Sequence, residues 1–300
     1  MASLFRAFAG RLSRHLRSAF ALGRLDGGGD VAAASKNYEA TWSARLTQIH
    51  DVIGQGETEL PRVLALVARR TEQIRKMDLG RGRYVAFDMA VELPSRGAQK
   101  LHRGSIVEAV IDLCSPDTQA VVELGSGWGE HLCNIWASGG PRDATYYACE
   151  ITESGRECAR VLAGLERGLR LEAPYFDYLN PDFSAIPRGH KDVVVYSVHS
   201  IEQVRDIPME LITRLCRLAD SVKVAHFEPV GWQMIDAAQK TELTRRHEAR
   251  CDEKRYNRNF WALLRQAEAD HRIQVRTAIP NFFGLEHNPT SYIVWEKTVV

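Results

Sequence analysis

Residues 121–131 read Val-Val-Glu-Leu-Gly-Ser-Gly-Trp-Gly-Glu-His. A short apolar run that contains one carboxylate is followed by three glycines at alternate positions. The apolar run predicts a buried strand, the glycines Gly125, Gly127 and Gly129 predict a tight turn, and the residues from Leu132 onward predict a helix. Because glycine has no Cβ, the backbone of this turn can come close to a ligand. The pattern alone is also typical of a plain strand-to-helix turn.

Two carboxylates favour a ligand site over a plain turn. Glu123 stands at the end of the predicted strand, where it can face hydroxyl or positively charged groups of a ligand. Glu150 ends the next strand-like run, Ala144–Glu150, twenty-one residues after Gly129. In nucleotide-binding βαβ units, an acidic residue about twenty residues beyond the turn hydrogen-bonds the ribose hydroxyls. We therefore expect a ligand that carries a ribose.

The segment Val-Glu-Leu-Gly-Ser-Gly-Trp-Gly resembles motif I of the class I, Rossmann-like methyltransferases that use S-adenosylmethionine, and the resemblance covers roughly residues 105–300. Its third glycine comes one residue too early for the NAD and FAD fingerprint Gly-x-Gly-x-x-Gly/Ala. The resemblance implies S-adenosylmethionine as the cofactor, with Glu150 on the ribose and Asp177 beside the adenine. The remaining cofactor contacts that it implies are Glu123, Gly125, Ser126, Gly127, Gly129, Tyr178 and Ser197.

Two later strand-like runs each end in a histidine and a carboxylate: His199 and Glu202 after the first, His226 and Glu228 after the second. Ligands of open α/β sheets bind beyond the carboxyl ends of the strands, so both pairs are expected to meet where the methyl group would be transferred. Transfer to a hydroxyl requires alignment and a base, and neutral histidine can take a proton near pH 7. We expect His199 to be the base, with His226 as the second candidate. Glu202 or Glu228 would orient the imidazole or hold the acceptor.

The same four side chains are potential ligands of a divalent ion, but no compact ligand motif supports one and we expect no metal. The expected function is therefore O-methylation of a small-molecule, sugar or glycan hydroxyl. Two alternatives stay open: an N-methyltransferase that acts on a peptide or protein side chain, and a scaffold that binds the cofactor without catalysis. Four residues of later loops are candidates to line the acceptor pocket: Asn257, Arg258, His287 and Asn288.

Strand-like and helix-like segments alternate from Gln119 onward, which predicts a parallel sheet covered by helices on both faces. Two β-rich runs at the end, Ile273–Ile279 and Ser291–Glu296, predict an antiparallel hairpin joined by a Pro/Asn/Gly-rich link. The expected fold is thus α/β, with a Rossmann-like, mostly parallel seven-strand sheet. The segments are strand 119–124, helix 130–137, strand 144–150, helix 153–166, strand 169–174, strand 192–198, helix 207–219 and strand 221–227, followed by an exposed, charge-rich helix face in 240–255 and a helix from Phe260.

Residues 1–104 are expected to form an N-terminal helical extension or cap, and residues 105–300 the cofactor-binding methyltransferase domain. Apolar stripes from Tyr38 to Ile53 and from Leu60 to Met77 predict two helices in the extension. The segment Leu79–Arg103 contains glycines and a proline that interrupt any long element, and a helix is expected only from Ser105. One arginine or lysine of this segment is a candidate partner for the methionine carboxylate of the cofactor, although such charges are usually solvated.

The first twenty-five residues contain five arginines and no acid, with apolar residues at helical spacing. Three interpretations stay open: a helix that packs on the body of the protein, a basic amphipathic helix on an anionic membrane surface, and a mitochondrial-type transit peptide. A secretory apolar core is absent, so export is not supported.

Composition limits the partners. The net charge of +1 over 300 residues provides no general field for a polyanion, so nucleic acid is not an expected partner. Six scattered cysteines without a Cys-x-x-Cys pair are typical of reduced thiols in the cytoplasm. No apolar stretch reaches the roughly 18–20 residues of a membrane span. We expect a cytoplasmic protein, with membrane contact only through residues 1–25. The helical extension is also a candidate contact between copies of the chain.

Overall fold

The computed structural model describes residues 31–74 and 80–298. The predicted basic segment 1–25 lies outside these residues. Among the helices described, none is long and apolar enough to cross a membrane.

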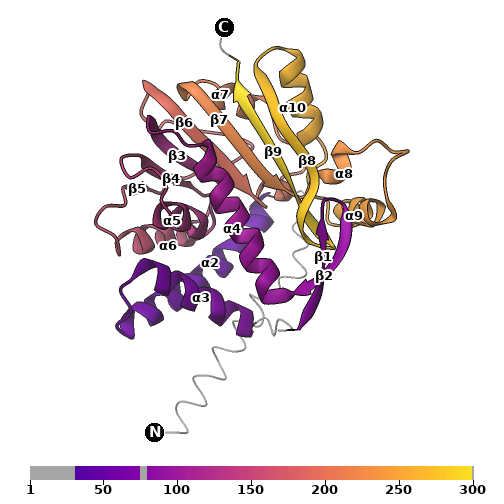
Figure 1. Ribbon diagram of the computed structural model, residues 1–300. Helices are drawn as coiled ribbons and strands as arrows, with labels where there is room; N and C mark the ends of the chain where they lie inside the picture. The colour runs from indigo at the N-terminus through magenta and orange to yellow at the C-terminus, as the bar shows by residue number, and fades with distance from the viewer. Residues whose placement is uncertain (1–30, 75–79, 299–300) are drawn as a thin grey trace.

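A nine-stranded sheet forms the centre of the molecule, in the order β2-β1-β8-β9-β7-β6-β3-β4-β5 (Figure 1). The five strands from β3 to β7 pair in parallel, and β9, β8, β1 and β2 continue the sheet in antiparallel pairs. This arrangement confirms the predicted Rossmann-like α/β fold with its C-terminal hairpin. The strands are β1 Arg81–Ala86, β2 Met89–Pro94, β3 Thr118–Leu124, β4 Thr145–Cys149, β5 Leu171–Glu172, β6 His190–Val198, β7 Ala219–Glu228, β8 Ile273–Leu285 and β9 Asn288–Lys297.

Helices cover both faces of the sheet. Alternate residues of β3 show the two layers, since Val121 joins a core with the helices α2 to α6 and Val122 joins a second core with α7 and α10. The helices are α2 Val31–Gly54, α3 Leu60–Ile74, α4 Ser95–Leu113, α5 Glu130–Ala137, α6 Glu153–Ala163, α7 Met209–Leu215, α8 Gly231–Met234, α9 Glu242–Glu253 and α10 Phe260–Ala269, with a 3₁₀ turn at Ile201–Gln203.

The order of the parallel strands creates a switch point at the carboxyl ends of β3 and β6. The chain runs outward from β3 through β4 to β5, then returns to β6 on the other side of β3. Connections therefore diverge at the carboxyl ends of β3 and β6. Such a switch point is where open α/β sheets bind ligands.

The segment before the parallel strands differs from the prediction. Residues 81–94 form the hairpin β1–β2, which extends the sheet through β8, and α4 begins at Ser95 rather than at Ser105. The turn of the hairpin consists of Phe87 and Asp88, both with positive φ, and lacks the glycine that usually marks such a turn. α4 crosses the expected boundary at 104/105. Its first turn buries Ser95 and Ala98, and Ala98 packs with Tyr84 and Phe283, which offsets the cost of Gly97 and Gly104.

The predicted link within the C-terminal hairpin is also part of a strand. β8 continues through Pro280 and Asn281 to Leu285, with a shift of register between Ile279 and Phe283. Asn281 takes a positive φ at this irregularity, and its side-chain amide donates to Asp88 at 2.8 Å. The tertiary contact therefore keeps in the sheet a stretch whose composition is typical of a loop.

Candidate active site

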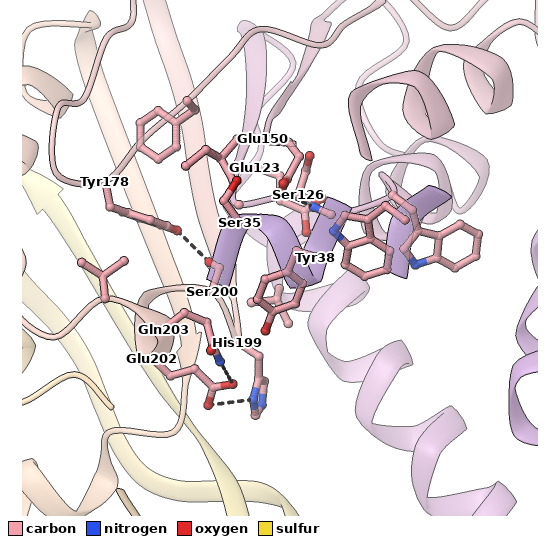
Figure 2. Close-up of a pocket in the computed structure, with 18 of the residues that line it drawn as sticks. Ser35, Tyr38, Glu123, Ser126, Glu150, Tyr178, His199, Ser200, Glu202 and Gln203 are labelled. Carbon is pink, nitrogen blue, oxygen red and sulfur yellow. Dashed lines mark hydrogen bonds and ion pairs between the residues drawn. The ribbon is translucent and has the colours of Figure 1, made fainter. Parts of the chain in front are cut away.

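A cavity of about 550 Å³ opens at the carboxyl ends of β3, β4 and β6, within the size range of small-molecule sites. The glycine loop after β3 forms one wall, and the turn after β6 forms another (Figure 2). Helix α2 contributes Ser35, Tyr38 and Trp42, so the N-terminal segment takes part in the site. The far end is formed by residues from α9 to Tyr256 and from the turn between β8 and β9.

The three glycines of the loop all have positive φ, at 66°, 55° and 77° for Gly125, Gly127 and Gly129. A Cβ at each would come within 2.5 to 2.8 Å of protein atoms, from Ser200, Trp42 and Ala159 respectively. The sequence led us to expect that bare backbone here makes room for a ligand. The structure shows that the missing Cβ atoms make room for neighbouring protein, and that the loop is held in its conformation by that packing.

Glu150 holds the loop from the side of β4. Its Oε2 accepts the Gly127 N–H at 2.9 Å, and its Oε1 accepts the N–H and the hydroxyl of Thr152 at 2.9 and 2.7 Å. Burial raises the pKa of this carboxyl, while the hydrogen bonds from Thr152 and Gly127 oppose the rise. Oε2 carries one bond from the described residues and still has a lone pair available to a ligand hydroxyl.

Glu123 lies at the bottom of the cavity, 2% exposed. One of its oxygens lies 3.1 Å from Nδ1 of His131, and the other accepts the hydroxyl of Tyr196 at 3.0 Å. Burial would lower the pKa of His131, but the Glu123 carboxylate outweighs this effect and raises it. The sequence motif contains His131, but nothing in its spacing marked it as the partner of Glu123.

Asp177, which was expected beside the adenine, and Tyr178 both line the cavity. Asp177 Oδ1 accepts the N–H of Leu179 at 2.9 Å, and the Tyr178 hydroxyl contacts the Leu124 carbonyl and the Ser200 hydroxyl at 2.9 and 2.7 Å (Figure 2). Ser126 also lines the cavity, and its buried hydroxyl has no hydrogen-bond partner among the described residues. This hydroxyl is therefore available to hydrogen-bond a polar group in the cavity.

The expected roles of Ser197 and His226 are wrong. Both are 0% exposed, neither lines the cavity, and the Ser197 hydroxyl contacts His226 Nδ1 at 2.9 Å. The other ring nitrogen, Nε2, accepts the indole N–H of Trp295 at 3.0 Å, and burial lowers the pKa of His226 to about 3. The reason is register: the two residues pair within the β6–β7 ladder, before the strands end.

Glu228 is likewise enclosed rather than exposed to the cavity. It is 0% exposed, and its Oε1 accepts the Ser200 N–H at 3.2 Å. Burial raises its pKa to about 7. Of its two expected roles, contact with the acceptor is therefore wrong. Glu228 still acts on the turn that carries His199, because it accepts the Ser200 N–H and its charge helps to raise the pKa of His199.

His199 and Glu202 do meet in the cavity. Nδ1 of His199 lies 3.6 Å from Glu202 Oε2, and Nε2 lies 2.6 Å from the hydroxyl of Thr290 (Figure 2 shows the ion pair). Burial would lower the pKa of His199, but Glu202 outweighs this effect and raises it. The Thr290 hydroxyl also lies 2.9 Å from Nε2 of His102, whose pKa burial lowers to about 3. Neither Thr290 nor His102 was a sequence candidate.

Two of the four candidates for the acceptor pocket line the cavity, namely His287 and Asn288. Asn257 is 1% exposed and donates to the Val204 carbonyl at 2.8 Å, and Arg258 pairs with Asp252 outside the cavity. Among the cations of 79–103, Arg103 pairs with Glu130 at 2.9 Å and faces a neighbouring cavity of about 420 Å³.

Across residues 31–74 and 80–298, no group of three or more His, Cys, Asp or Glu side chains is arranged to hold an ion.

No protein-family model and no curated protein matches this chain. Among solved structures it is similar to a geranyl diphosphate methyltransferase in complex with S-adenosylmethionine, at 14% identity and a TM-score of 0.47, over 69% of this chain and 90% of that chain. A magnesium protoporphyrin IX methyltransferase from Synechocystis PCC 6803 with bound S-adenosylhomocysteine is 18% identical, at a TM-score of 0.45 over 68% and 84%. Similarity at this level does not identify a function, which rests on the residues of the cavity.

Proposed function

We propose that this chain binds S-adenosylmethionine in the cavity and transfers its methyl group to an acceptor hydroxyl. The observation that carries the proposal is one continuous cavity in which the glycine loop and Glu150 form one part of the wall and the His199–Glu202 pair forms another. The first part supplies backbone and carboxylate groups suited to an adenosyl ligand. The second supplies a candidate base.

The residues present fit this cofactor. The free lone pair of Glu150 Oε2 suits a ribose hydroxyl, and the orphaned hydroxyl of Ser126 suits a polar group of the ligand. Asp177 and Tyr178 would flank the adenine, while Glu123 with His131 would face the methionine end. When bound, S-adenosylmethionine supplies a methyl group that is already activated as a sulfonium.

His199 would take the proton that an acceptor hydroxyl loses on attack. Glu202 stabilises the positive charge that the imidazole then acquires, and this is why it raises the pKa of His199. Both ring nitrogens have contacts in the structure, so the acceptor must displace the Thr290 hydroxyl from Nε2 or the Asn288 amide, which lies 3.4 Å from Nδ1. The amine alternative fits less well, because Glu202 is already paired and offers less attraction to a cationic acceptor.

Helix α2 belongs to the site rather than to a separate unit. Trp42 packs against Gly127, and the Glu39 carboxylate accepts the N–H groups of Glu153 and Ser154 at 2.9 and 3.0 Å, at the start of α6. Tyr38 lines the cavity from the same helix (Figure 2). We therefore propose that the N-terminal extension caps the cofactor.

Calorimetric titration with S-adenosylmethionine and S-adenosylhomocysteine tests the cofactor. Both should bind, and Glu150→Gln should weaken both about tenfold or more, because an amide NH₂ would face the N–H of Gly127 or Thr152 and leave a donor unpaired. Glu157→Gln, an exposed change on α6, is the matched control and should bind normally. Failure of the unmodified chain to bind either compound would refute the proposal.

The acceptor is tested by mass spectrometry of a panel of hydroxyl and amine compounds incubated with S-adenosylmethionine. Methyl groups should be found on oxygen, and His199→Gln should lower the rate at least about tenfold. Methylation of nitrogen alone would refute the hydroxyl assignment. Tight cofactor binding without any product would instead support the scaffold alternative.

A further inference from the structure

One cation that lines the cavity, Arg250, forms no ion pair with the described residues. Arg250 lies on α9 and lines the cavity together with Tyr256 and His287. Its Nε is buried without a hydrogen-bond partner, and no carboxylate of the described residues forms an ion pair with its guanidinium. A partly buried guanidinium costs free energy unless an acceptor meets it.

The carboxylates that line the cavity near Arg250 already have partners. Glu202 Oε1 accepts the amide of Gln203 at 2.8 Å, and its Oε2 accepts the amide of Asn288 at 3.0 Å and pairs with His199. The positive charge of Arg250 also acts on His287: burial lowers the pKa of His287, and Arg250 lowers it further. The charge of Arg250 is thus left for a ligand.

Arg250 and the candidate base belong to different segments but to one cavity. His199 follows β6, while Arg250 lies on α9, and Asn288 of the β8–β9 turn contacts both His199 and Glu202. A ligand with a hydroxyl at His199 could therefore place a second group against Arg250. Arginine presents a planar fork of donors that matches carboxylate and phosphate oxygens.

We propose that Arg250 binds a carboxylate or phosphate group of the acceptor, so that the substrate is an acidic hydroxyl compound. The proposal rests on the proposed function, because it assigns the second contact of the same acceptor. A cofactor carboxylate has the same chemistry, so the test must separate the two sources.

The first measurement compares S-adenosylhomocysteine with 5′-methylthioadenosine, which lacks the amino-acid carboxylate. Arg250→Gln should leave both affinities within about twofold of the original. Arg246→Gln is the matched control, since Arg246 is exposed on the same helix and pairs with Glu242 at 2.9 Å. Loss of about tenfold or more for S-adenosylhomocysteine alone would show that Arg250 holds the cofactor, and would overturn the proposal.

The second measurement titrates the chain, saturated with S-adenosylhomocysteine, with inorganic phosphate and with benzoate at constant ionic strength, followed by NMR. At least one anion should bind saturably, with affinity reduced about tenfold or more in Arg250→Gln, retained in Arg246→Gln and partly retained in Arg250→Lys. Absence of Arg250-dependent saturation by both anions would overturn the proposal. Binding of S-adenosylhomocysteine in the first measurement reports separately on the proposed function.

Discussion

Replacement of His226 by glutamine should change how the stability of this protein depends on pH. His226 is 0% exposed, and its ring contacts the Ser197 hydroxyl and the Trp295 indole. Burial lowers its pKa from the ordinary 6.5 to about 3. Between these values the unfolded chain binds a proton that the folded chain does not, so the free energy of unfolding falls as the pH falls.

The size of the effect follows from the shift. The unfolded histidine is half protonated at pH 6.5 and almost fully protonated at pH 5, so its effect on the unfolding free energy grows from about 0.7 to about 1.3 kcal/mol per pH unit. Between pH 6.5 and 5 it removes about 1.6 kcal/mol. Glutamine does not titrate, and its side-chain oxygen can still accept the Trp295 N–H. Burial also lowers the pKa of His102 to about 3 and that of His247 to about 4, but these contributions are present in both proteins and cancel in the difference.

The assay is urea unfolding of both proteins at half-unit steps from pH 5.0 to 6.5, at one ionic strength. The mean slope of unfolding free energy against pH over this range should be smaller in His226→Gln by about 1.1 kcal/mol per unit, whatever its absolute stability. Affinity for S-adenosylhomocysteine at pH 7.5 should be unchanged. Parallel pH dependences would show that His226 titrates as an accessible group, which would refute its burial and restore it as a candidate base.

Three other perturbations address the cavity itself. Gly127→Ala should weaken the binding of S-adenosylhomocysteine at least about tenfold in calorimetry and lower the thermal midpoint, because the new Cβ would lie 2.7 Å from Trp42. Gly139→Ala is the control that separates the steric cost from the backbone cost, since Gly139 also has a positive φ but has open space around it. The rate of methyl transfer should rise with pH through the pKa of His199. Glu202→Gln should move that rise to lower pH, since the Glu202 carboxylate raises the pKa of His199. An unchanged pH profile of kcat/KM in this variant would contradict the pairing of the two side chains. Glu39→Gln should cost about 1–2 kcal/mol in urea unfolding, because its carboxylate accepts two N–H groups at the start of α6; a change below the error of the assay would contradict this capping role.

The local sequence pattern was sufficient to predict the elements at the centre of the sheet. The strand, glycine turn and helix over 119–137 lie where predicted, because an apolar run, positive-φ glycines and a helical stripe each depend on neighbouring residues. The hairpin 81–94 was missed, since β2 is largely exposed and β1 depends on its pairing with the distant strand β8. The predicted strand 169–174 is reduced to Leu171–Glu172 with one further bridge between Glu150 and Tyr175, at the edge of the sheet.

The position of a candidate site residue could be predicted where that residue follows the end of a strand. His199 and Glu202 lie beyond β6, as their position in the sequence indicated. His226 has the same kind of neighbours in the sequence as His199, but β7 continues to Glu228 and leaves the His226 side chain inside the sheet. The strand ends two residues beyond the histidine, and this difference places His226 in the core rather than in the cavity. Arg250 lies in a helix whose charges were all expected to be exposed, and only the three-dimensional structure shows that Arg250 lines the cavity.

The two ends of the cavity are built by different means, and this should determine how variants behave. Packing against Trp42, Ser200 and Ala159 holds the glycine loop in place before any ligand arrives, so little free energy of binding is spent on ordering it. A substitution there must disturb folding and cofactor affinity together. At the acceptor end the buried Nε of Arg250 has no hydrogen-bond partner among the described residues, so the folded chain carries a free-energy cost that an anionic ligand at the guanidinium can offset. Replacement of Arg250 by a neutral residue should therefore weaken acceptor binding without lowering the free energy of unfolding. Selectivity for the acceptor should depend on this end of the cavity rather than on the glycine loop.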